Sequence, residues 1–143
     1  MTAEVLFSET FPATAEAVRG QLTCLQARVG GRDVDADAGS DMLIVLGEVL
    51  NNIVEHATAG RDDGRISVTV RDDGARLSVE TADDGRPLPP TLLTCGAGPL
   101  VDGSTDDLPE GGFGWFMIHS LARDMMYERR EGLNLLSFSL AAG

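Results

Sequence analysis

Hydrophobic residues in the first part of the chain recur mainly at the spacing of amphipathic helices. The apolar positions of residues 13–29 predict one helix, after a short strand at residues 5–7. A second helix is predicted to be capped by Ser40 or Asp41 and to run to about Thr58. The expected core face of this second helix consists of Leu43, Leu46, Leu50, Ile53 and Ala57.

The hydrophobic period changes to two in the middle of the chain. Apolar and polar residues alternate through residues 66–70 and again through residues 77–79, with Asp73 and Gly74 between the two runs. An Asp-Gly pair between alternating runs is typical of a hairpin turn. We therefore expect an antiparallel hairpin here.

The last third of the chain combines a long irregular segment with two regular ones. Residues 86–110 contain five prolines and several glycines, which makes them too long and too irregular for an ordinary connection and predicts a mobile lid. A third helix is expected from about Trp115 to Tyr127, and a strand from Leu133 to Leu140. The apolar positions of that helix are Met117, Ile118, Leu121 and Met125.

Size and composition indicate one cytoplasmic domain. With 143 residues and 15.1 kDa, the chain is long enough for one hydrophobic core, so we expect residues 1–143 to form a single domain. The longest apolar run, residues 42–46, is too short to span a membrane. The first twenty residues include Glu4 and Glu9 and lack the basic and apolar regions of a secretory signal.

The chain is strongly acidic and contains no lysine. Its net charge of −12 disfavours binding to nucleic acids and anionic membranes, which attract basic surfaces, and favours a protein partner. All eleven basic residues are arginine, which excludes the P-loop lysine and the catalytic lysine of ordinary protein kinases. Cys24 and Cys95 are far apart in the sequence and indicate neither a disulfide framework nor a zinc site.

Three polar residues of the second predicted helix share one side of it. Glu48, Asn52 and His56 follow one another at steps of four residues. A carboxylate can accept a proton from a hydroxyl group, and an amide oxygen can bind magnesium. The simpler interpretation is a solvated helix face, and the three residues alone do not exclude it.

Asp83, Asp84 and Gly85 end the second strand of the predicted hairpin. A carboxylate at this place can accept a hydrogen bond from an exocyclic amine such as that of adenine, and Gly85 lets a base approach the backbone. The alternative is a plain turn, because Asp-Gly pairs are typical turn residues. From the residues alone the two interpretations have equal weight.

Gly111, Gly112 and Gly114 come directly before the third predicted helix. Accessible backbone amides and the positive end of a helix dipole favour phosphate at such a place, and a flexible hinge is the alternative interpretation. The cluster is not a Walker motif, because no Gly-Lys-Ser/Thr follows it. It is also not a dinucleotide-binding fingerprint, because it follows a long loop instead of a strand.

The order of these three features resembles a known family. The segment GEVLNNIVEHA is similar to the N box of the GHKL ATPases, and ADDGRPLPP is similar to their first glycine box. The segment GGFGWFMIHSLARDMMYERREGLN resembles the second glycine box of the anti-sigma factor serine/threonine kinases. The resemblance covers about residues 40–140. It implies the Bergerat (GHKL) ATP-binding fold, an α/β two-layer sandwich with a mixed, mostly antiparallel sheet, helices on one face and an ATP lid at about residues 86–110.

The resemblance also implies the cofactors ATP and Mg²⁺ and the roles of the polar helix residues. Glu48 would be the general base of phosphoryl transfer. Asn52 would be the magnesium ligand, and His56 would line the pocket near the nucleotide.

The remaining nucleotide contacts follow from the two glycine boxes. Asp83 would bind the adenine base, with Gly85 beside it. The residues that wrap the phosphates would be Gly111, Gly112 and Gly114. Family members commonly support adenine recognition with a threonine near the start of the final strand, where this chain has Asn134, whose side chain can also form that hydrogen bond.

The chain departs from the family at one position. Family kinases often carry an arginine just before the glycine turn, whereas Pro109 and Glu110 occupy that place here. No arginine or lysine lies between Arg86 and Arg123. The charge that develops during phosphoryl transfer would therefore be less well stabilised. ATP binding is better supported than phosphoryl transfer.

The resemblance implies a protein serine/threonine kinase that acts in partner switching. Such a kinase phosphorylates a STAS-domain anti-sigma antagonist, binds a sigma factor and forms a homodimer. The alternative is a non-catalytic binding module whose bound nucleotide selects its protein partner. A catalytic fragment of a sensor histidine kinase ranks below both, because the chain contains no helix pair bearing a phosphoacceptor histidine.

Overall fold

The computed structural model describes residues 4–31, 36–58, 63–87, 118 and 120–141. The elements follow one another as β1 (Glu4–Pro12), α1 (Ala15–Gly30), α2 (Ala36–Asn52), the π-helix η1 (Ile53–Ala57), β2 (Arg65–Asp72), β3 (Arg76–Asp83), β4 (Arg123–Arg130) and β5 (Leu133–Ala141).

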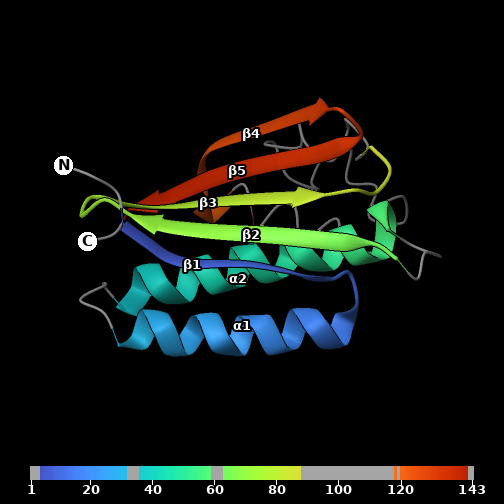
Figure 1. Ribbon diagram of the computed structural model, residues 1–143. Coiled ribbons are helices and arrows are strands. Elements are labelled where there is room, and N and C mark those ends of the chain that lie inside the picture. Colours follow the sequence, from blue (N-terminus) through green and yellow to red (C-terminus); the bar gives the residue numbers. More distant parts are fainter. Residues whose placement is uncertain (1–3, 32–35, 59–62, 88–117, 119, 142–143) are drawn as a thin grey trace, which may run out of the picture.

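The strands form one sheet with helices on one face. The strand order is β1-β2-β3-β5-β4, and α1 and α2 both lie on the same side of the sheet (Figure 1). Each neighbouring pair among the described strands is antiparallel, so this part of the sheet is not mixed as the family resemblance suggested. The expected two-layer α/β sandwich with helices on one face is confirmed.

The core lies between the sheet and the helices. Alternate residues of each central strand point to the helix side, and their side chains meet the apolar stripe of α2. Each fully buried aliphatic side chain of this kind contributes about 1.5–3 kcal/mol to stability. The buried residues from α2 and the three central strands include Met42, Val45, Leu46, Val49, Leu50, Ile66, Val68, Val70, Leu77, Val79, Leu136, Phe138 and Leu140.

Helix α1 begins and ends at residues that suit its two termini. The Thr14 hydroxyl accepts a hydrogen bond from the Ala17 N–H at 3.0 Å, which satisfies one of the unpaired amides of the first turn. The helix stops at Gly30, one of the two glycines that follow the predicted apolar pattern.

No helix in the described part of the chain is long and apolar enough to cross a lipid bilayer.

Helix α2 begins earlier than the sequence indicated. It starts at Ala36, so neither Ser40 nor Asp41 is its cap. The reason is tertiary packing, because Ala38 and Gly39 of the first turn are buried. A Cβ atom on Gly39 would lie 3.1 Å from a methyl group of Val29 in α1. Close contact between the two helices thus favours an additional N-terminal turn, which the predicted cap at Ser40 or Asp41 had left out of the helix.

The turn between β2 and β3 is the predicted hairpin turn at Asp73 and Gly74. Gly74 has a φ angle of 92°, a backbone conformation that glycine adopts without steric strain. The Asp73 carboxylate accepts hydrogen bonds from the N–H groups of Ala75 and Arg76 at 2.9 and 2.7 Å. These hydrogen bonds lower the pKa of Asp73, and the bond from Ala75 has the largest effect. The turn is therefore stabilised by Asp73 above its ordinary pKa and loses this support as the pH falls through the lowered value.

The expected third helix is wrong in its C-terminal half. Among the described residues of this region, the helical ones end at Leu121, and the strand β4 begins at Arg123 instead of continuing as a helix to Tyr127. A tight turn at Glu131 and Gly132, with φ angles of 54° and 81°, joins β4 to β5. Two consecutive positive φ angles match the twist of a two-residue hairpin, so pairing with β5 overrides the helical spacing of the apolar residues.

Candidate functional site

The polar residues of α2 lie where this helix changes into a π-helix. The Thr58 N–H donates to the Ile53 carbonyl at 2.9 Å, a wider i→i+5 bond than that of an α-helix. Asn52 is only 4% exposed, and its Nδ2 donates to the Glu48 carbonyl at 2.8 Å. The Glu48 side chain is half-buried, whereas His56 is exposed on η1. The structure therefore keeps Glu48 and Asn52 one turn apart and places His56 in a more open environment.

Asp83 is the last residue of β3 and is buried, with 3% of its surface exposed. Its Oδ1 accepts hydrogen bonds from the Gly85 N–H at 2.9 Å and from Asn134 Nδ2 at 2.8 Å. Within the described part of the chain, no hydrogen bond reaches its other oxygen, Oδ2. Burial raises the pKa of Asp83, against the lowering effect of the bonds from Asn134 and Gly85. A buried carboxylate with one oxygen held by the protein can present the other to a ligand.

Gly85 follows the end of β3 and packs against the end of η1. The Arg86 N–H donates to the Ala57 carbonyl at 2.8 Å, immediately beside Gly85. A Cβ atom at position 85 would lie 2.4 Å from the same carbonyl oxygen. Glycine is therefore required for this close approach. Because η1 continues directly from Asn52, this junction connects the polar residues of α2 with Asp83.

Replacement of Gly85 by Ala is expected to destabilise the protein by about 1–3 kcal/mol, because the added methyl group would overlap the backbone of Ala57. Urea unfolding followed by circular dichroism measures this free energy. The matched control is Gly20→Ala in α1, where a Cβ would meet nothing within 4 Å. This control should be as stable as the wild type or more stable. Equal stability of both variants would show that the junction is not tightly packed.

Two residues of β4 also bind to this end of the sheet, and the sequence analysis did not select them. Tyr127 Oη donates to Asn134 Oδ1, and Arg129 Nη1 donates to the same oxygen at 3.0 Å. Arg129 Nη1 also donates to the Gly85 carbonyl at 2.6 Å. Tyr127 was expected at the end of the third helix, and no element was predicted between that helix and the strand at Leu133, where Arg129 lies. The Glu-Gly pair at 131–132 before an apolar run was the signal that could have indicated a hairpin.

The phosphate side of the predicted site falls outside the described residues. This applies to Gly111, Gly112 and Gly114, and to residues 88–110 of the expected lid. Of the residues in the first and second predicted motifs, the structure brings Asp83 and Gly85 together with Asn134 at one end of the sheet. In Figure 1 the ends of β3 and β4, the start of β5 and the end of the α2–η1 segment lie at this same end of the molecule.

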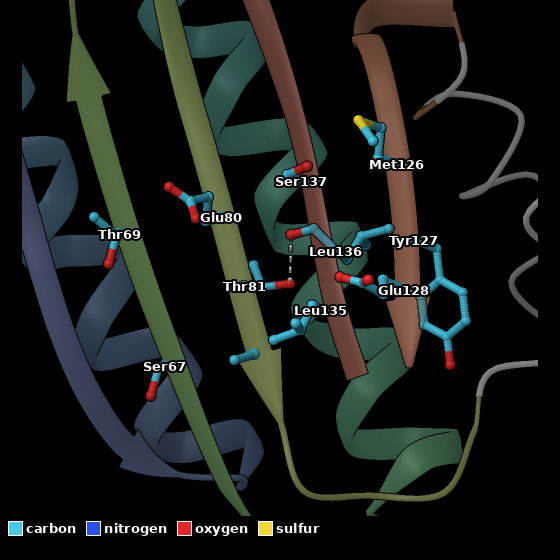
Figure 2. A pocket seen from close by; sticks show the side chains of 11 residues that line it. Ser67, Thr69, Glu80, Thr81, Met126, Tyr127, Glu128, Leu135, Leu136 and Ser137 are labelled. Atoms are coloured by element: carbon cyan, nitrogen blue, oxygen red, sulfur yellow. Dashed lines mark hydrogen bonds between the residues drawn. The ribbon is translucent and has the colours of Figure 1, made fainter. Parts of the chain in front are cut away.

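A separate cavity of about 520 Å³ lies on the other face of the sheet. Ser67, Thr69, Glu80 and Ser137 point into it, and the helices lie behind the strands in this view (Figure 2). Side chains of β3 alternate between the two faces of the sheet, and Asp83 is among the buried ones that face the helices. This cavity is therefore distinct from the predicted nucleotide site.

A family model described as the histidine kinase-like ATPase domain matches residues 11–140. This match includes all three predicted motifs. No curated protein matches the sequence significantly.

Solved structures with a similar fold include two from histidine kinases. The catalytic domain of the histidine kinase ThkA shares 16% sequence identity, with a TM-score of 0.56, and the match covers 95% of this chain and 97% of that one. The histidine kinase domain of a blue-light activated histidine kinase from Erythrobacter litoralis also shares 16% identity, with a TM-score of 0.52. The match covers 87% of this chain and 61% of the Erythrobacter chain. At these identities the likeness establishes the fold.

Proposed function

This chain belongs to the family of histidine kinase-like ATPase domains, and from this premise we propose that it is a cytoplasmic, ATP-dependent protein serine/threonine kinase. Its substrate is a STAS-domain anti-sigma antagonist, and it binds a sigma factor in partner switching, as a homodimer. Membership of this family supports the binding of ATP. The serine/threonine specificity and the protein partners rest on the resemblance of the second glycine box to that of the anti-sigma factor kinases.

The observation that carries the nucleotide assignment is the state of Asp83. Its Oδ1 is held by Gly85 and Asn134, and its Oδ2 accepts no bond from any described residue. A carboxylate oxygen in a buried place is a strong acceptor for the exocyclic amine of adenine. The donor and acceptor chemistry of these residues therefore fits an adenine base.

Glu48 and Asn52 provide the groups that phosphoryl transfer requires. The Asn52 side chain uses its nitrogen to bond the Glu48 carbonyl, so its oxygen is the atom that suits a magnesium ligand. Bound magnesium would neutralise phosphate charge. Within the described residues no group of three or more His, Cys, Asp or Glu side chains could hold a metal ion. A magnesium ion here would take its further ligands from the nucleotide phosphates and water. Glu48 would accept the proton of the attacking hydroxyl group.

One observation favours the alternative of a nucleotide-gated binding module without efficient phosphoryl transfer. Pro109 and Glu110 stand where kinases of this type often carry an arginine. Arg129, which lies at the site, is bound to the Gly85 carbonyl beside the proposed adenine contact. It therefore belongs to the base end of the site. In this alternative ATP would select between protein partners without being consumed.

Calorimetric titration of ATP, with Mg²⁺ and with EDTA, tests the assignment that both functions share. We expect the wild type to bind ATP more tightly with Mg²⁺. Asn52→Ala should lose this magnesium-dependent gain, about tenfold or more in affinity, because it removes the proposed ligand. Asn51→Ala is the matched control, since Asn51 is the neighbouring exposed asparagine of α2.

The two negative outcomes have different meanings. If the folded wild type binds no ATP, the nucleotide assignment is wrong and the proposed function falls with it. If Asn52→Ala keeps the full effect of magnesium while it remains folded, the ATP site stands but Asn52 is not the metal ligand. Thermal unfolding of each variant shows whether the fold is intact.

A further inference from the structure

Three polar side chains form a row across the end of the sheet. The strand register places Asp83 of β3 opposite Asn134 of β5, and Asn134 opposite Arg129 of β4. Directly paired residues of antiparallel strands project from the same face. Tyr127 lies two residues before Arg129 and thus points to the same face. One row of side chains therefore runs from the edge strand β4 to the proposed adenine contact.

The amide of Asn134 occupies the middle of this row and uses all its hydrogen-bonding capacity. Its Nδ2 donates to Asp83 Oδ1 at 2.8 Å and to the Arg86 carbonyl at 2.7 Å. Its Oδ1 accepts bonds from Tyr127 and Arg129. A side-chain amide has two N–H donors and an oxygen that accepts two bonds, so all four positions are matched.

Three of these partners, the acceptors of Asp83 and Arg86 and the donor of Arg129, favour one orientation of the Asn134 amide. A flipped amide would place its oxygen against the acceptors of Asp83 and Arg86, and its nitrogen against the guanidinium of Arg129, which has no acceptor. Asn134 is 1% exposed, so water cannot replace the lost partners. The bonds from Tyr127 and Arg129 hold the Asn134 oxygen and thereby help to keep its N–H groups directed toward Asp83.

The orientation of Asn134 affects the charge of Asp83. The bond from Asn134 and the positive charge of Arg129 both lower the pKa of Asp83, while burial and the neighbouring charge of Asp84 raise it. The adjoining element η1 offers the Ala57 carbonyl to this turn, and its titratable side chains, Glu55 and His56, are exposed. An ionised Asp83 can only accept hydrogen bonds, whereas a protonated one can donate.

We propose that Tyr127 and Arg129 are positioning residues that give the nucleotide site its preference for a 6-aminopurine over a 6-oxopurine. They act through Asn134, which holds Asp83 as an acceptor aimed at the base. This inference rests on the proposed function, in which Asp83 receives the amino group of adenine. Without the two donors, the Asn134 amide is held less firmly and Asp83 loses the nearby positive charge of Arg129. Asp83 then takes up a proton on Oδ2 more readily and can donate it to a 6-oxo group.

The test compares the affinities for ATP and inosine triphosphate, which differ at the 6-position of the base. We expect the double variant Tyr127→Phe/Arg129→Ala to lose about tenfold or more of the wild-type preference for ATP. In the nucleotide-free protein, NMR of the Asp83 carboxyl carbon should show titration at a higher pH than in the wild type. A purely structural role of β4 would not move this titration.

Two further variants serve as controls. Arg130→Ala removes an equal charge from β4 at a residue that pairs with Glu128, and it should leave both the preference and the titration unchanged. Arg129→Lys keeps a cation with N–H donors. This variant should therefore retain more of the preference for ATP than the double variant does.

Two outcomes would overturn the inference in distinguishable ways. If the wild type prefers ATP and the folded double variant keeps both the preference and the Asp83 titration, the β4 residues do not position the site. If the wild type binds neither nucleotide, the proposed function itself fails, and the inference fails with it.

Discussion

Replacement of Asp83 by Asn is expected to reverse the base preference of the proposed nucleotide site while the fold remains intact. The oxygen of the new amide can accept the bonds that Gly85 and Asn134 now donate to Oδ1. Its NH₂ group then stands in the place of Oδ2, so that a donor faces the amino group of adenine. Loss of a hydrogen bond to a charged acceptor costs about 1.5–3 kcal/mol, which corresponds to about a tenfold to hundredfold weaker affinity for ATP.

The same substitution should strengthen the relative binding of 6-oxopurine nucleotides. Inosine and guanosine triphosphates carry an oxygen at the 6-position, which accepts the bond that the new amide donates. Calorimetric titration with ATP and inosine triphosphate measures both affinities. Asp84→Asn is the matched control, because Asp84 is the adjacent carboxylate and bonds the Arg65 N–H at the start of β2 instead. A similar loss of affinity for both nucleotides in Asp83→Asn would contradict a direct contact with the base.

The stability of Asp83→Asn provides an independent check on this environment. Burial raises the pKa of Asp83 above its usual 3.8, so the folded state binds this proton more tightly than the unfolded state. The contribution of Asp83 to the free energy of unfolding therefore falls as the pH rises from 3.8 through the raised pKa. At neutral pH we expect Asp83→Asn to be as stable as the wild type or more stable, because the buried charge is gone. Urea unfolding as a function of pH would show the loss of this dependence.

The parts of the fold with local signals could be predicted from the sequence. The β2–β3 hairpin has period-two alternation on both sides of Asp73 and Gly74, and the structure confirms it. Helix α1 follows its apolar pattern and ends near the two glycines at 30–31. In these segments the local conformational preference and the burial of the apolar face agree.

The parts set by contacts between distant residues could not be predicted in the same way. Strand β4 carries apolar residues at helical spacing, and only its pairing with β5 decides its conformation. The early start of α2 depends on packing of Gly39 against Val29.

The same distinction applies to the candidate site. Asp83 could be selected from the Asp-x-Gly pattern, but its burial depends on the surrounding strands. The contacts of Arg129 follow from a strand register that the sequence pattern did not reveal.

Replacement of Glu48 by Gln should separate the two proposed functions of the site. If the wild type is a kinase, the variant should transfer phosphate to a STAS-domain protein at least about a hundredfold more slowly, because general base catalysis typically contributes a factor of about 10²–10⁴. Glutamine has nearly the same shape as glutamate but cannot accept the proton of a serine or threonine hydroxyl. The affinity for ATP should remain within about twofold of the wild type, since the proposed base contact is Asp83, which Asn134 holds.

The control for this experiment is Glu55→Gln, which removes an equal charge from an exposed position of η1. Transfer of ³²P from ATP to the STAS-domain protein gives the rates, and calorimetry gives the affinities. A kinase predicts rapid transfer by the wild type and by Glu55→Gln, with slow transfer by Glu48→Gln alone. The opposite outcome is that none of the three proteins transfers phosphate, while ATP still changes the affinity of the wild type for its partner. Catalysis would then lack the phosphate-neutralising arginine whose place Pro109 and Glu110 occupy. The protein would then act as a nucleotide-gated binding module.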